Sequence, residues 1–162
     1  MQGIHLKFQD IPTIGFAHHF NAENYFQSYN IADDSFEIVY IKAGDVTAKL
    51  YDKVYDIEAG SILVLFRRLP IELSSKNRTP HTHCSVQIKT SGVAEFIDSD
   101  FQIPKDSTRG IMLPFITPPC QENELIKKDL YSIISLIGGN NEAGKFSASL
   151  CAMGVLSKLD SL

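Results

Sequence analysis

The most conspicuous residues that could carry chemistry are two histidines, His81 and His83, separated by a single threonine. Side chains at positions i and i+2 of a β-strand point to the same side, so both imidazoles would face one shared space. Imidazole is a common ligand for first-row transition metals, and it is also a versatile hydrogen-bonding group. The spacing therefore indicates a polar pocket lined by the pair, with a metal site or a solvated strand end as alternatives.

Other reactive side chains do not form a recognisable catalytic constellation. Cys84 directly follows His83, so on a strand the two side chains would face opposite ways and could not form a dyad. Cys120 lies between a proline pair and a polar segment, and Cys151 lies near an apolar stripe. The sequence contains no Gly-rich phosphate loop and no GxSxG motif. These patterns favour binding over catalysis, and we expect neither an enzyme activity nor a cofactor.

Aromatic and polar residues elsewhere could contact a ligand held beside the histidines. Aromatic rings such as Tyr40 recur on successive strands, where they could stack on a sugar or another ring, or form ordinary core. His19 follows His18, and only one of two successive strand residues can face inward. Phe8 ends an N-terminal run with apolar residues at alternating positions. The candidate ligand-binding residues are His83, His81, Tyr40, His19, Phe8 and Gln87.

A series of short strands must position these residues. Runs of β-branched and aromatic residues alternate with turns at Ala43-Gly44-Asp45 and Glu58-Ala59-Gly60. The predicted strands span residues 36–42, 46–51, 54–57, 61–66, 71–74 and 81–88. Such regular spacing is typical of an antiparallel sandwich or barrel, and a small closed barrel can hold one ligand.

This arrangement resembles the cupin barrel, which is a double-stranded β-helix or jelly roll. Metal-binding cupins use a His-x-His pair, followed by an acidic residue about four positions on and a histidine from a later strand. Here Gln87 occupies the acidic position, and no histidine follows His83. Because these two further ligands are missing, the comparison with metal-binding cupins implies a metal-free pocket. The alternative is a stand-alone metal-dependent enzyme, such as an isomerase or a dioxygenase. Near-stoichiometric metal bound through His81 and His83 in the purified protein would favour that alternative.

The period of the apolar residues changes near the end of the chain. Apolar residues from Glu122 to Ile137 fall on one helical face, and Gly138 suits the end of that helix. A second helix is predicted over residues 145–158, with a stripe at Phe146, Leu150, Met153 and Leu156. We divide the chain into an N-terminal arm and barrel, residues 1–119, and a helical hairpin, residues 120–162. Either stripe could pack on the barrel or face a second copy. The candidate dimerisation residues are Leu130, Ile134, Ile137, Leu150 and Met153.

Bulk properties exclude several classes of function. The net charge of −4 argues against direct binding of nucleic acid by these residues. No apolar run approaches the roughly 18 residues of a membrane span, and the first residues lack the apolar core of a signal peptide. We expect a cytoplasmic protein with reduced thiols and no membrane partner.

The run FEIVYIKAGDVTAKLYDKVYDIEAGSILVLF, followed by a proline, a loop and HTHCSVQI, resembles the effector-binding and dimerisation domain of AraC-type transcription regulators. The resemblance covers roughly residues 15–160. It implies a barrel that binds a sugar or another small effector, an N-terminal arm (residues 1–12) that closes over the ligand, and a late helix that forms a homodimer. By position, the histidine that lines the pocket on the last barrel strand falls on His83, with His81 as the alternative.

The chain also departs from that family. Glu72 lies where a histidine is common, Asp33-Asp34-Ser35 occupy the region of a usual arginine, and no tryptophan flanks the pocket strand, which leaves the effector class open. The family reads DNA with two helix-turn-helix units in a further C-terminal domain, whereas this chain stops at Leu162. We expect an excised domain in preference to a natural stand-alone sensor, with DNA contacted only through that missing domain. A pure dimerisation module with a filled barrel is a third hypothesis.

Overall fold

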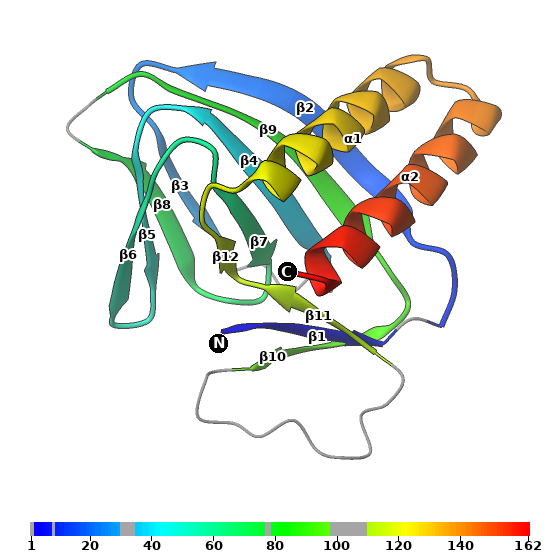
Figure 1. The fold of residues 1–162 in the computed structure, drawn as a ribbon, viewed down its shortest axis with the longest axis horizontal. Helices are drawn as coiled ribbons and strands as arrows, with labels where there is room; N and C mark the ends of the chain where they lie inside the picture. Colours follow the sequence, from blue (N-terminus) through cyan, green and yellow to red (C-terminus); the bar gives the residue numbers. More distant parts are fainter. Residues whose placement is uncertain (1, 8, 30–34, 77–78, 98–109) are drawn as a thin grey trace.

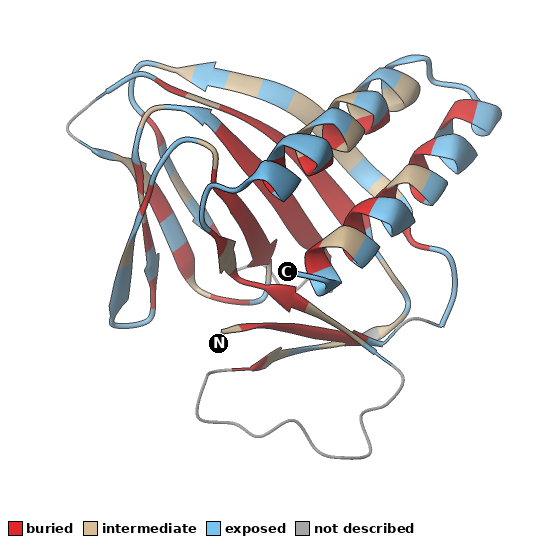
Figure 2. Cartoon of the chain, in the orientation of Figure 1, coloured by how far each residue is buried: buried red, intermediate tan, exposed pale blue. Residues whose placement is uncertain are grey.

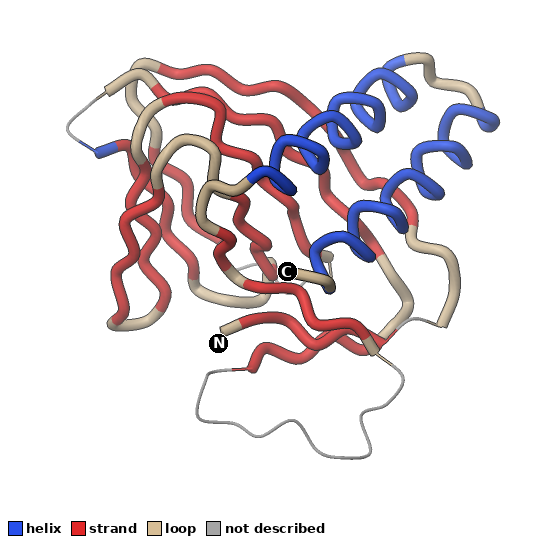
Figure 3. Tube along the Cα trace, in the orientation of Figure 1, coloured by secondary structure: helices blue, strands red, loops and turns tan. Residues whose placement is uncertain are grey.

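The structure is a computed structural model, and it describes residues 2–7, 9–29, 35–76, 79–97 and 110–162. In these residues two antiparallel sheets face each other as a barrel, a small third sheet lies across one end, and a helix pair packs on one side (Figures 1 and 3). This confirms the predicted cupin-like jelly-roll barrel followed by a helical hairpin.

The five-stranded sheet carries the histidine pair and has the order β12-β7-β4-β9-β2. Its strands are β2 (Thr13–Ala22), β4 (Phe36–Ala43), β7 (Ile62–Phe66), β9 (His81–Lys89) and β12 (Ile116–Thr117). His83 of β9 lies opposite Phe20 of β2 and Ile41 of β4. Because directly opposed residues share a face, this register gathers the side chains that flank His83 on the inward side of the sheet.

The four-stranded sheet forms the facing wall, in the order β3-β8-β5-β6. Its strands are β3 (Phe26–Tyr29), β5 (Val46–Leu50), β6 (Lys53–Ile57) and β8 (Ile71–Ser75). Buried and more exposed residues alternate along β5, where Val46, Ala48 and Leu50 are buried. One face of this sheet is therefore solvated, and its other face supplies apolar side chains to the barrel interior.

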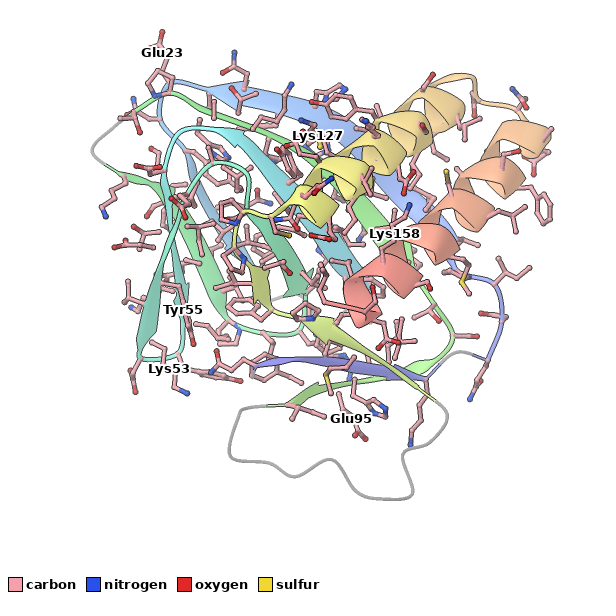
Figure 4. The ribbon with its side chains drawn as sticks, in the orientation of Figure 1. Glu23, Lys53, Tyr55, Glu95, Lys127 and Lys158 are labelled. Atoms are coloured by element: carbon pink, nitrogen blue, oxygen red, sulfur yellow. The ribbon has the colours of Figure 1, made fainter. Side chains whose placement is uncertain are left out.

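The third sheet has β1 (Gly3–Lys7) between β10 (Val93–Ile97) and β11 (Ile111–Pro114). Ile4 and Leu6 of β1 are fully buried. The Tyr55 hydroxyl, near the end of the barrel in Figure 4, donates a hydrogen bond to Gln2 Oε1. The described part of the expected N-terminal arm is therefore the middle strand of a sheet that lies across the barrel end, instead of a free segment.

The two helices, α1 (Gln121–Gly138) and α2 (Glu142–Asp160), match the predicted hairpin to within three residues at each end. Asn123 ties the start of α1 to the barrel, because its amide donates to the Gly60 carbonyl at 2.8 Å and the Pro118 carbonyl at 3.0 Å. At the start of α2, the Asn141 side chain accepts a hydrogen bond from the Gly144 N–H at 2.7 Å, which is a normal N-cap.

The buried face of α2 differs from the predicted stripe. Its small residues Ala148 and Ala152 are fully buried, together with Val155, whereas Phe146 and Leu150 are exposed. The small side chains let α2 approach its neighbours closely. Leu156 of the predicted stripe is buried as well, together with Leu159. Figure 2 shows buried residues concentrated along β4, β7 and β9 and on the barrel-facing sides of both helices.

Candidate ligand-binding site

A cluster of buried polar side chains occupies the inward face of the five-stranded sheet. On β9 the alternate residues His81, His83, Ser85 and Gln87 are all buried, and Glu37 of β4 lies opposite Gln87. Polar groups are rarely buried without a reason, because each must keep its hydrogen bonds or lose free energy. This polar cluster is therefore the best candidate for a site inside the barrel.

The two histidines contact each other directly. His81 Nε2 and His83 Nδ1 are 2.7 Å apart, which is a hydrogen-bonding distance. The Tyr25 ring stacks on His81 with centroids 4.5 Å apart, and the Phe20 ring stacks on His83 at 4.9 Å. Burial lowers the pKa of both imidazoles, that of His83 to about 3. Both rings are thus neutral at pH 7, and each offers one hydrogen-bond donor and one acceptor.

Glu37 is the least expected member of the cluster, since only 2% of it is exposed. Burial raises the pKa of its carboxyl above the ordinary value. Hydrogen bonds from Ser85 and Tyr29, and the positive charge of Arg67, act in the opposite direction and keep the shift smaller. Burial likewise raises the pKa of Tyr29, so this phenol stays protonated.

Arg67 lies just beyond the end of β7 and borders the cluster. Its guanidinium carbon is 5.8 Å from the centre of the Phe16 ring and 5.9 Å from that of Tyr29. Arg67 therefore brings a fixed positive charge to an aromatic edge of the polar cluster.

Three buried polar atoms of this cluster have no hydrogen-bond partner among the described residues. They are Glu37 Oε2, Arg67 Nε and His81 Nδ1. An unpaired buried polar group costs about 1–3 kcal/mol, so three in one cluster are difficult to explain as core packing alone. Glu37 Oε2 is a hydrogen-bond acceptor, or a donor when the carboxyl is protonated. Arg67 Nε is a charged donor, and His81 Nδ1 can donate or accept according to the tautomer.

The described residues do not bring together three or more His, Cys, Asp or Glu side chains in an arrangement that could hold a metal ion. The histidine nitrogens that approach each other are engaged in their mutual contact. What the cluster offers is hydrogen bonding, one positive charge and aromatic surface. Separately, none of the helices in the described chain has the length and apolar character required to cross a membrane.

Three of the six predicted ligand-binding residues come together, namely His81, His83 and Gln87. Gln87 donates a hydrogen bond to Ser35 Oγ at 2.7 Å, so its amide is already in use. Phe8 lies outside the described residues.

Tyr40 and His19 require a correction of the expected orientation. The Tyr40 hydroxyl donates to Glu124 Oε1 of α1 at 2.5 Å, and the His19 ring lies 4.8 Å from the Tyr131 ring of the same helix. Both residues therefore face α1 on the outward side of the sheet, because alternate strand residues point to opposite faces. Lys127, labelled in Figure 4, lies 5.2 Å from the Tyr40 ring centre.

Sequence reasoning did not select Glu37, Tyr25, Tyr29 or Arg67. The sequence around Glu37 did contain a usable signal. Glu37 lies within the otherwise apolar run of residues 36–41, so its carboxyl must be buried if the neighbouring residues on the same face of the strand are buried. The two tyrosines lie in a segment without periodicity, and only the fold brings them to the histidines.

The candidate dimerisation residues fall into two groups. Leu130 is fully buried within this chain, so the structure contradicts its assignment to a surface that meets a second copy. Ile134 and Ile137 are half-buried against the core. Leu150 and Met153 are exposed, as a contact surface requires.

The fold and the site together define a class of protein. It is a small antiparallel barrel whose interior presents buried hydrogen-bonding groups, which is the architecture of single-ligand binding barrels. The chain also matches the family described as AraC-like ligand binding domain over residues 14–157. The chain therefore belongs to the AraC-like ligand-binding domain family.

The solved structures that are similar to this chain share little sequence with it. An apo form of ToxT from Vibrio cholerae is 12% identical, with a TM-score of 0.53, and the match covers 96% of this chain and 58% of that one. Unsaturated fatty acid-bound ToxT from the same organism is 13% identical over 96% of this chain and 59% of that one, with a TM-score of 0.49. A cupin protein from Bacteroides fragilis is 17% identical over 64% of this chain and 76% of that one, with a TM-score of 0.34. The chain thus spans little more than half of the ToxT chain. A search of curated proteins found no match.

Proposed function

We propose that this chain is the effector-sensing domain of an AraC-type transcription regulator, and that the effector binds in the barrel at the polar cluster. The single observation that carries the proposal is the group of unpaired buried atoms on Glu37, Arg67 and His81. A ligand that paired with these atoms would gain their hydrogen bonds without displacing any bond within the protein. We infer a role in binding in preference to catalysis, which is consistent with the description of the family as a ligand-binding domain.

The cluster favours an effector with several hydroxyl or carbonyl oxygens. The neutral imidazoles each offer a donor and an acceptor, Glu37 Oε2 offers an unpaired carboxyl oxygen, and the Phe16 and Phe20 rings offer faces for stacking. A sugar meets these requirements. A fatty acid, which ToxT binds in one of its structures, would use Arg67 for its carboxylate and leave most of the other groups unpaired.

The test is a ligand screen with purified protein. Thermal denaturation would be followed in the presence of pentoses, hexoses, sugar acids and unsaturated fatty acids, since a ligand that binds only the folded state raises Tm. We expect a hit among the polyhydroxylated compounds, and His83→Ala should weaken its binding at least tenfold in calorimetry while the protein remains folded. His5→Ala, outside the barrel interior, serves as the control. A hit whose affinity is the same in His83→Ala would remove the cluster from the binding site.

We further propose a homodimer formed through the exposed apolar face of α2, which comprises Phe146, Leu150 and Met153. These residues recur at helical spacing on one side of α2, and Phe146 is 58% exposed. Such a stripe is typical of a helix that packs against another apolar surface. In the regulator, the dimer would pass the effector signal to a DNA-binding domain beyond this chain, in the cytoplasm.

Dimerisation can be measured by sedimentation. Leu150→Asp should shift the protein to the monomer mass, because it places a charge in the centre of the stripe. Leu125→Asp is the matched control, since Leu125 is similarly exposed on α1, and it should leave the mass unchanged. A dimer that persists in Leu150→Asp would exclude this face.

A further inference from the structure

A hollow lies outside the barrel, between the start of β2 and the end of the helical hairpin where α1 and α2 are connected. It has a volume of about 390 Å³ and is partly open to solvent. Residues of the β2 side, including Ile11, Pro12 and Ile14, form one wall, and Ile137, Phe146 and Ser149 form the other. Both helices contact β2, which passes beside the helix pair in Figure 1.

A bulge in β2 changes which side of the sheet its side chains face, so that Ile14 before it faces the hollow and Phe16 after it faces the barrel interior. The pairing of β2 with β9 shifts between Ile14 and Phe16, so Ile14 lies opposite Ile88 and shares its outward face. Gly15 stands at the bulge because a Cβ there would lie 2.2 Å from Gln87 Oε1. The same strand thus presents Phe16 and His18 to the barrel and Ile14 to the hairpin.

Ser149 provides a polar group inside this apolar hollow. It is 7% exposed, it lines the hollow, and its hydroxyl has no hydrogen bond with any described residue. Helical serines commonly bond to the carbonyl four residues earlier, as Ser132 does to Lys128 at 3.1 Å. The Ser149 hydroxyl is therefore left available to a molecule in the hollow.

The charges at the rim cancel. Lys145 Nζ lies 2.8 Å from Glu142 Oε1, and both residues line the hollow. Neither a cation nor an anion would gain a free partner there without breaking this ion pair.

We propose that this hollow binds an uncharged, predominantly apolar molecule of one or two rings with a single hydroxyl, which pairs with Ser149. The volume lies within the range of about 300–1,000 Å³ typical of small-molecule sites. Because Ser149 is largely buried, a small ring compound can reach its hydroxyl more readily than a flat protein surface can. This site lies outside the barrel and does not depend on the function proposed for the polar cluster.

The test uses 2-naphthol, which has two fused rings and one hydroxyl, and the full chain with carbon-13-labelled isoleucine methyl groups. Titration should produce saturable shifts at Ile14 and Ile137, with smaller changes at Ile41 in the barrel. Ser149→Val should weaken binding by roughly tenfold, the effect of one lost hydrogen bond. Ser147→Val, on the exposed side of the same helix, should bind as the original protein does.

Several results would overturn the proposal. One is the absence of saturable shifts, and another is a response centred on Ile41. Equal weakening in both serine variants would also exclude Ser149 as the partner. If the isoleucine methyl shifts changed with the protein concentration and not with the 2-naphthol concentration, the hollow would instead be a contact surface for a second copy of the chain. If Ser149→Val does not fold, Ile11→Asp at the exposed mouth replaces it, with Leu125→Asp as its control, and only the former should abolish binding.

Discussion

The two walls of the barrel are built on different principles. The five-stranded sheet turns a polar set inward, including His83 and Glu37, whereas β5 and β8 of the opposite sheet turn apolar residues inward, including Ala48 and Leu73. Tyr29, on the edge strand β3, is an exception that joins the polar wall through Glu37. The polar groups therefore face an apolar surface across the barrel interior. Under the proposed function, an effector held between the two walls would need one polar and one apolar face.

The largest expected effect is on the apolar wall. Leu73 is almost completely buried, and Leu73→Ala removes three carbon atoms from that packing. We expect the free energy of unfolding to fall by about 2–5 kcal/mol in urea denaturation, the usual range for such a cavity. Val54→Ala on the exposed side of β6 should change it by less than about 0.5 kcal/mol. Similar losses in both variants would mean that the apolar wall is not the source of stability.

The polar wall should instead appear in the pH dependence of stability. His83 has a pKa near 6.5 when unfolded and about 3 when folded, so the unfolded state binds more protons between these values. The His83 contribution to stability is therefore complete above pH 6.5 and is lost as the pH falls, by up to about 1.4 kcal/mol per pH unit. His83→Gln should reduce the loss between pH 6.5 and 5 by about 1–2 kcal/mol in urea titrations.

Glu37 provides the counterpart with the opposite sign. Its folded pKa is raised, so its contribution is present at low pH and is lost as the pH rises through the folded pKa. Glu37→Gln should thus leave stability unchanged below the ordinary glutamate pKa and flatten the decline that follows as the pH rises above it. If His83→Gln and Glu37→Gln changed the same side of the profile, the assigned protonation states would be incorrect.

The barrel and hairpin could be predicted because their signals are local. Strands such as 36–42 and 61–66 carry β-branched and apolar runs next to glycine turns, and α1 has a clear apolar period. The third sheet is different, because β1 pairs with β10 and β11 from the far side of the barrel sequence. No local pattern encodes such long-range pairing.

Within the site, the sequence identified the histidines but not their neighbours. The i, i+2 spacing of His81 and His83 is sufficient to place both on one face. Tyr40 and His19 were assigned to the wrong side because an isolated strand does not reveal which of its faces is covered by a helix. The same uncertainty affected α2, where Leu156 of the predicted stripe is buried but Phe146 and Leu150 are exposed.

The smallest expected effect distinguishes structural from ligand-contacting members of the polar wall. Gln87 and Ser35 are both buried and joined by a 2.7 Å hydrogen bond, so Gln87→Leu should cost about 1 kcal/mol in urea denaturation. Ser35→Ala should cost a similar amount, and the double variant should cost little more than either, because both remove the same bond. Effector affinity should change less in Gln87→Leu than in His83→Ala. If Gln87→Leu reduced the effector affinity as much as His83→Ala does, without a loss of stability, Gln87 would be a ligand-contacting residue and not a structural one.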